Sequence, residues 1–171
     1  RKELRGSIEH AAWNMRAFAE NQLPRQWGLD VEPDVRINQI MRPIESIGCY
    51  VPGGRFSLMS TLLMTEIPAM VAGVRRIVVV SPKPNEQLLA AAHILGVTQV
   101  ARIGGAQAIA ALSYETKTIA PVDKIFGPGN RFVTAAKQLV SGDCAIDLPA
   151  GPTEAIGRAN SGDARWIWAG L

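Results

Sequence analysis

The sequence predicts an α/β protein: a Rossmann-like open parallel sheet with helices on both faces, preceded by an N-terminal helical arm. An apolar run, a turn containing glycine or proline, and a helical segment recur four times from Ile44 onward. One of these runs, residues 77–80, is entirely apolar and β-branched, which is typical of a parallel strand covered on both faces. The short connections between runs and helical segments favour right-handed crossovers, and therefore a parallel sheet.

Residues 1–43 are predicted to form the helical arm and a connector. Apolar residues spaced three and four apart predict a helix with one apolar stripe: Leu4, Ile8, Ala11, Met15 and Phe18. This stripe can pack on its own domain or on a second subunit, and the spacing does not choose between them. Residues 24–33 are rich in turn-forming residues and end the helix, while Val35, Ile37 and Ile40 indicate a short extended stretch.

Residues 44–158 are predicted to form the Rossmann-like domain. Its strands are expected at residues 44–51, 76–80, 97–103, 122–126 and 145–148. Its helices are expected at residues 61–72, 85–95, 106–113 and 131–140. Two of these helices end at Gly73 and Gly96, because glycine favours the left-handed conformation that closes a helix. Residues 159–171 are interpreted as the start of a helix that leads into a C-terminal part of a longer parent protein.

The composition is that of an ordinary globular protein and excludes several classes. With 171 residues, 47% of them hydrophobic and 19% charged, the chain can form a core and is not disordered. The net charge of +3 is too small and too dispersed to indicate a nucleic-acid partner. No apolar run is long enough to span a membrane, and no segment resembles a secretion signal. Cys49 and Cys144 lie far apart, so we expect reduced, buried thiols and a cytoplasmic location.

Glycine-containing loops follow four of the five predicted strands at their carboxyl ends. In open parallel sheets these loops converge at one edge, where ligands bind. Glycine lets the backbone approach a ligand closely, and the helix that follows offers unpaired N–H groups to an anion. The sequence therefore predicts a phosphate-bearing or dinucleotide ligand. Because the usual G-x-G-x-x-G pattern is missing, the contacts to a dinucleotide are expected to be irregular.

Four polar residues lie at the loop-to-helix junctions of this edge: Tyr50, Gln107, Asn130 and Thr153. Gln107 and Asn130 have a second interpretation, as helix-entry residues that satisfy the local backbone. The two histidines are interpreted as structural, His10 as solvent-facing and His93 as partly buried on a helix. Neither belongs to a zinc-binding or serine-hydrolase motif, so no catalytic residue and no metal ligand is predicted in this chain.

Eight short motifs of the sequence strongly resemble those of the histidinol dehydrogenase family. They occupy residues 48–54, 60–64, 67–69, 71–73, 104–112, 122–125, 127–130 and 150–154. The resemblance covers the chain from about Ile8 onward. It implies an intertwined homodimer with Rossmann-like domains, a bound zinc and two successive NAD-dependent oxidations. These convert L-histidinol to L-histidinal and then to L-histidine.

By this resemblance, Tyr50, Gln107 and Asn130 correspond to NAD-contacting positions. Thr153 corresponds to a substrate-contacting position that usually carries serine, and it keeps the hydroxyl. The family's zinc ligands and its glutamate–histidine acid–base pair follow a segment similar to residues 163–171. The resemblance therefore implies a cofactor-binding part without the reaction centre, and the isolated chain is expected to be inactive.

Two other functions stay open at this point. The parent protein could oxidise a different small amino or hydroxy alcohol, with Thr153 as part of an altered pocket. The chain could also be a non-catalytic binding module that has kept the fold and lost the chemistry.

Overall fold

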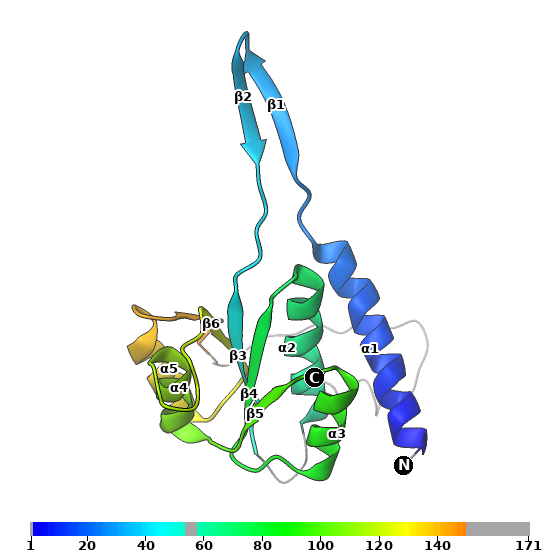
Figure 1. Cartoon of the computed structure of the whole chain (residues 1–171), viewed down its shortest axis with the longest axis vertical. Helices are drawn as coiled ribbons and strands as arrows, with labels where there is room; N and C mark the ends of the chain where they lie inside the picture. Colours follow the sequence, from blue (N-terminus) through cyan, green and yellow to red (C-terminus); the bar gives the residue numbers. More distant parts are fainter. Residues whose placement is uncertain (1, 54–57, 150–171) are drawn as a thin grey trace.

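The structure is a computed structural model, and it describes residues 2–53 and 58–149 (Figure 1). A central parallel sheet with helices on both faces follows an N-terminal helix, which confirms the fold class predicted from the sequence. In chain order the elements are α1 (Lys2–Gln22), β1 (Trp27–Glu32), β2 (Val35–Gln39), β3 (Ser46–Tyr50), α2 (Met59–Ala72), β4 (Arg76–Val80), α3 (Glu86–Ile94), β5 (Gln99–Ala101), α4 (Gly105–Ser113), β6 (Lys124–Phe126), α5 (Arg131–Val140) and β7 (Ala145–Ile146).

The central sheet has five parallel strands in the order β5-β4-β3-β6-β7. The chain enters at β3, adds β4 and β5 on one side, and then crosses to add β6 and β7 on the other. Helices α2 and α3 cover one face, and α4 and α5 cover the opposite face (Figure 1). The strand order reverses between β3 and β6, and the carboxyl end of such a reversal is where doubly wound proteins bind ligands.

The core forms two apolar clusters, one on each face of the sheet. Tyr50, Val78 and Val80 belong to the cluster beneath α4 and α5. Cys49 and Val79 belong to the cluster beneath α2 and α3. Neighbouring residues separate in this way because successive side chains of a strand point to opposite faces. All five residues of β3 are buried, as expected for the central strand.

The helix ends agree with the local sequence signals. Gly73 and Gly96 have φ angles of +86° and +78°, which confirms the left-handed closures expected there. The Asn85 side chain accepts a hydrogen bond from the Leu88 N–H at 2.9 Å and caps the start of α3. Four strands are shorter than the apolar runs that predicted them, because the runs continue into loop residues, some of which, such as Val51, are also buried.

The apolar stripe of α1 packs on its own domain. Ile8 is buried, and Leu4, Ala11 and Met15 pack with it against the cluster beneath α2 and α3. Phe18 differs from the other stripe residues, because it remains 67% exposed. The sequence left the stripe's partner open, and the structure assigns most of it to α2 and α3.

A β-hairpin replaces the turn-rich segment that was expected at residues 24–33. Strand β1 pairs with β2 in antiparallel register, with Leu29 opposite Ile37 and Asp34 at positive φ in the turn. The hairpin stands away from the body of the molecule (Figure 1). The prolines on either side of β1 suggested turns, whereas the alternation of apolar and polar residues along residues 27–32 decided the strand. The predicted domain limits at residues 43 and 158 stay predictions.

Two further expectations concern single residues. Cys49 and Cys144 are both free thiols in the described structure and both are buried, as expected. His10 is exposed as expected, but the partial burial expected for His93 is wrong, because the His93 side chain lies on the exposed face of α3. Among the described residues, no helix is both long and apolar enough to cross a membrane.

Candidate cofactor site at the carboxyl edge of the sheet

The loops that follow β3, β4 and β5 meet at the carboxyl edge of the sheet. A Cβ atom added to Gly104 would lie 2.4 Å from the Cβ of Pro82. One added to Gly53 would lie 2.8 Å from the Cγ of the same proline. Glycine is therefore needed at both positions for the three loops to pack around Pro82. The expected convergence of the strand-to-helix loops holds for these three, two of which contain glycine.

Tyr50 connects the central strand to the start of α4. Its side chain is buried among the residues beneath α4 and α5. Its hydroxyl accepts a hydrogen bond from the Gly105 N–H at 3.2 Å, at the first residue of α4. A helix N-terminus carries unpaired N–H groups and a partial positive charge. The Tyr50 hydroxyl thus fixes the position of one anion-attracting helix end.

Gln107 lies at the same helix end as the Tyr50 hydroxyl. Its side chain is exposed in the first turn of α4. A Cβ atom on Gly105 would lie 2.9 Å from Gln107 Oε1, so the amide folds back over the residue that Tyr50 contacts. Gly104, the cap residue of α4, has no side chain to cap the helix, and Gln107 forms no hydrogen bond with the backbone of the described residues. The helix-entry interpretation therefore does not account for Gln107.

Asn130 has the helix-entry role that the sequence left open. Its Oδ1 accepts hydrogen bonds from the N–H groups of Phe132 and Val133 at 3.0 and 3.1 Å, and so caps α5. This contact uses only the oxygen of the amide. The Nδ2 group has no protein partner among the described residues.

The loop of residues 127–130 lies against the end of β3. Gly127 has a φ of +117°, and a Cβ atom there would lie 2.1 Å from the Tyr50 carbonyl oxygen. Only glycine fits so close to another backbone in this conformation. Tyr50 therefore contacts two of the predicted loops, the Gly105 start of α4 through its hydroxyl and Gly127 through its carbonyl. The structure brings together Tyr50, Gln107 and the loop that carries Asn130.

Two residues of this region were not predicted from the sequence. Lys137 and Asp147 form an ion pair and both contact the backbone of Gly127. Lys137 looked like an ordinary lysine near the end of a helix. Asp147 offered a usable signal, because it is a charged residue within the apolar run of residues 145–148. Thr153, the expected substrate contact, lies outside the described residues.

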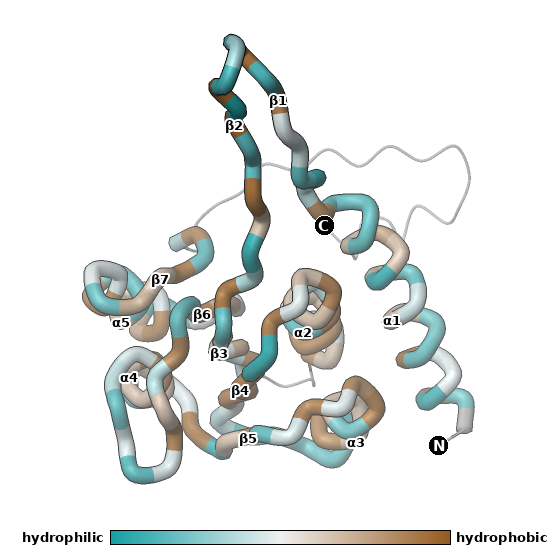
Figure 2. Tube along the Cα trace, turned by 45° about the horizontal axis from the view of Figure 1, so that its top comes forward, coloured by the Kyte–Doolittle hydropathy of each residue, from teal (hydrophilic) through white to brown (hydrophobic). Residues whose placement is uncertain are grey.

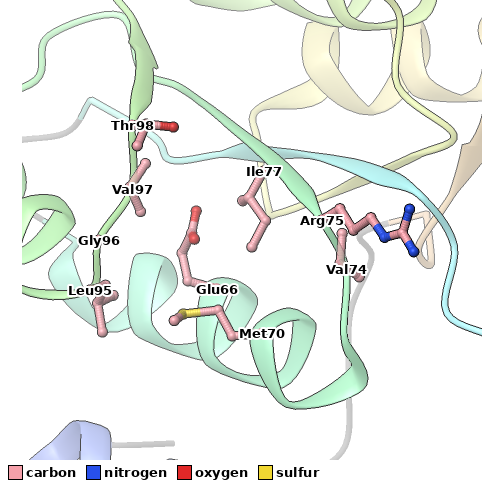
Figure 3. Close-up of a pocket in the computed structure, with 9 residues that line it drawn as sticks. All are labelled: Glu66, Met70, Val74, Arg75, Ile77, Leu95, Gly96, Val97 and Thr98. Carbon is pink, nitrogen blue, oxygen red and sulfur yellow. The ribbon is translucent and has the colours of Figure 1, made fainter.

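A cavity of about 190 Å³ lies at the opposite, amino edge of the sheet (Figure 3). Figure 3 shows the Glu66 carboxylate pointing from α2 towards the start of β4 and the segment before β5. Glu66 is fully buried, and both of its carboxylate oxygens lack hydrogen-bond partners in the described structure. Burial raises its pKa to about 7. None of the residues that line this cavity belongs to the candidate cofactor site.

Within the described ranges, no group of three or more histidine, cysteine, aspartate and glutamate side chains lies close enough together to hold a metal ion. These residues therefore do not fit the zinc site that the sequence resemblance implied for the family. The polar groups that they do bring together are a tyrosine hydroxyl, two amides and two helix N-termini. That set is suited to binding a polar, anionic ligand rather than a metal ion.

The strand order and the glycine-lined carboxyl edge define a doubly wound α/β domain of the Rossmann-like class. The family model of histidinol dehydrogenase matches residues 1–171. The chain therefore belongs to the histidinol dehydrogenase family.

Individual relatives give the same result. The histidinol dehydrogenase of Methanothermobacter thermautotrophicus is 49% identical over 158 residues, which are 90% of this chain and 37% of the relative. That of Aquifex aeolicus is 46% identical over 170 residues, which are 99% of this chain and 40% of the relative. The crystal structure of histidinol dehydrogenase from Elizabethkingia anophelis superimposes with a TM-score of 0.85 at 41% identity, over 90% of this chain and 37% of that one. The chain thus spans less than half of the length of these relatives.

Proposed function

We propose that this chain forms the NAD-binding part of a histidinol dehydrogenase. The whole protein is proposed to oxidise L-histidinol through L-histidinal to L-histidine in histidine biosynthesis, with zinc ligands that the described residues do not supply. The observation that carries the proposal is the position of Tyr50 at the strand-order reversal between β3 and β6. From there it contacts the start of α4 through its hydroxyl and Gly127 through its carbonyl.

In this proposal the described residues bind and orient NAD. Tyr50, Gln107 and the Nδ2 group of Asn130 supply hydrogen bonds, and the N-termini of α4 and α5 attract the phosphates. NAD itself supplies the hydride acceptor. Thr153 is proposed to contact the substrate through its hydroxyl.

The Tyr50 hydroxyl provides a direct test of NAD binding. We expect NAD to bind the chain in a calorimetric titration, and we expect Tyr50→Phe to weaken that binding about tenfold, or about 1.4 kcal/mol. The substitution also removes one hydrogen bond, so the free energy of unfolding should fall by about 1 kcal/mol. Tyr114→Phe is the matched control, because the Tyr114 hydroxyl donates to Asp143 at 2.8 Å on the surface, outside the candidate site. Equal NAD affinity in the two variants would contradict the role of Tyr50.

Turnover tests the reaction proposed for the whole protein. The 171-residue chain alone should give no measurable NADH from histidinol, even with added zinc, because in this proposal the zinc ligands come from other residues of the whole protein. A longer parent protein should produce two NADH per histidinol, one for each oxidation. Zinc-dependent NADH formation by the isolated chain would contradict this prediction.

The β1–β2 hairpin supports the proposal that the protein is a homodimer. Apolar side chains on it are exposed, among them Leu29 at 55% and its cross-strand neighbour Ile37 at 50%. Figure 2 shows hydrophobic segments along the hairpin at a distance from the body. An isolated two-stranded hairpin is only marginally stable in water, so an apolar covering surface is expected. We propose that a second copy of the chain supplies that surface.

Sedimentation measures this association. We expect the unsubstituted 171-residue chain, called the parent chain from here on, to sediment as a dimer. The double variant Leu29→Glu/Ile37→Glu should be a monomer, because the substitutions place charge on the apolar face of the hairpin. Glu32→Lys is a control at a polar hairpin position and should leave the dimer intact. A monomeric parent chain would contradict the proposal.

A further inference from the structure

Two charged residues outside the candidate cofactor site contact the loop of residues 127–130. Lys137 lies on α5 with 4% of its side chain exposed, and Asp147 follows β7 with 27% exposed. Their side chains form an ion pair beside Gly127. This pair is the most deeply buried ion pair among the described residues.

Lys137, Asp147 and Gly127 form a closed ring of hydrogen bonds. The Gly127 N–H donates to Asp147 Oδ2 at 2.8 Å. The Lys137 ammonium donates to the Gly127 carbonyl oxygen at 3.0 Å and also to Asp147 Oδ1. Side chains therefore satisfy both backbone polar groups of Gly127, at the point where the chain leaves β6.

The ring lies at Gly127, the first residue of the loop of residues 127–130. Glycine has more backbone freedom than any other residue, so Gly127 does not fix its own conformation. The contact with the Tyr50 carbonyl limits how closely the loop approaches β3. The two hydrogen bonds that Asp147 and Lys137 form with Gly127 set the orientation of the loop. Asn130 follows three residues later and starts α5.

The energetics of a buried ion pair favour a positioning role. Removing two charges from water costs free energy that the attraction between them often does not recover. An apolar pair of similar volume would often be as stable or more stable. Stability is therefore a weak explanation for the presence of this ion pair. Its two hydrogen bonds to Gly127, by contrast, require the Gly127 backbone to lie in one particular position.

We propose that Lys137 and Asp147 are positioning residues for the cofactor. They hold residues 127–130 so that Asn130 and the N-terminus of α5 face NAD. This inference rests on the proposed function, because NAD is the ligand that the loop is proposed to meet.

Asp147→Asn tests the inference in the full chain, by calorimetric titration with NAD and by amide hydrogen exchange at residues 127–130. We expect the NAD dissociation constant to rise at least tenfold and the Gly127 amide to exchange faster. Asp123→Asn is the matched control. Asp123 accepts hydrogen bonds from the Ser46 N–H and hydroxyl at 2.7 and 2.9 Å, at the amino ends of β3 and β6. The Asp123→Asn substitution should lower the free energy of unfolding and leave NAD affinity within about twofold of that of the parent chain.

A double variant separates positioning from stability. Lys137→Met alone leaves the Asp147 carboxylate without its partner and can unfold the chain. Lys137→Met/Asp147→Leu replaces the pair with apolar side chains, so we expect a folded chain with a melting temperature near that of the parent. Its NAD dissociation constant should still be raised at least tenfold. Parental NAD affinity in this variant, or in Asp147→Asn, would overturn the inference.

The two readouts distinguish failure of this inference from failure of the proposed function. If the parent chain does not bind NAD, the proposed function is wrong, and hydrogen exchange alone decides whether the ring positions the loop. Faster exchange at residues 127–130 in Asp147→Asn would then support positioning, and unchanged exchange would overturn it. If the parent binds NAD and Asp147→Asn binds it equally well, only the positioning inference fails.

Discussion

Replacing Gly127 by alanine is expected to lower the free energy of unfolding by about 3–5 kcal/mol, from backbone strain and steric overlap together. The new Cβ would lie 2.1 Å from the Tyr50 carbonyl oxygen, at a φ of +117°. The contacting atom is backbone of the central strand, so it cannot move aside as a flexible side chain could. Because the loop of residues 127–130 must shift, NAD affinity should fall as well. Denaturant unfolding and NAD titration of Gly127→Ala measure the two effects.

Gly96→Ala is the matched control for this substitution. Gly96 also has a positive φ of +78°, but nothing lies within 4 Å of the added Cβ. It should therefore show only the backbone strain, about 1–2 kcal/mol, and unchanged NAD affinity. Equal losses of stability in the two variants would show that the close approach of Gly127 to Tyr50 has no energetic role.

The stability of the chain should fall as the pH rises from about 4.5 to about 7, because of Glu66. Burial raises the Glu66 pKa from 4.5 to about 7, so the folded state keeps its proton at pH values where the unfolded chain has lost it. The stabilising effect is fully present below the unfolded pKa and is lost as the pH passes through the folded pKa. The total change is about 3 kcal/mol, since one pKa unit corresponds to about 1.4 kcal/mol.

Glu66→Gln removes the titrating group and should remove most of this pH dependence. Free energies of unfolding at pH 5 and pH 8, from denaturant titrations, measure the difference for the parent chain and the variant. At pH 8 the variant should be the more stable of the two, because a neutral amide replaces a buried charge that has no partner. Glu115→Gln alters an exposed carboxylate and serves as control. Parallel pH profiles for the parent chain and Glu66→Gln would refute the prediction.

Local sequence patterns were sufficient to predict most of the elements. The β-branched run of residues 77–80 corresponds to β4, and Gly73 and Gly96 end their helices as expected. These signals are local, because strand alternation, helix periodicity and glycine closures each depend on residues close in the chain. The hairpin was missed for the same reason. Prolines near β1 are a strong local signal for turns, and pairing with β2 outweighed it.

The candidate cofactor site was only partly predictable. The position of Tyr50, Gln107 and Asn130 at loop-to-helix junctions followed from the order of strands and helices, since parallel strands end at one edge. The capping role of Asn130 was foreseen as one of two possibilities. Lys137 was not foreseen, because nothing in its local sequence shows that a buried ammonium reaches back ten residues to Gly127.

The amino-acid sequence by itself determined the Rossmann-like fold of this protein and the edge of the sheet where its polar junctions gather. Both depend on hydrophobic periodicity and turn chemistry, which are properties of residues close together in the sequence. Only the tertiary structure decided which groups meet there. The Tyr50 hydroxyl and the Gly105 N–H are 55 residues apart, and Gly127 and Asp147 are 20 apart. Such contacts exist only after the sheet has packed against its helices, because packing alone sets the distances between residues so far apart in the chain.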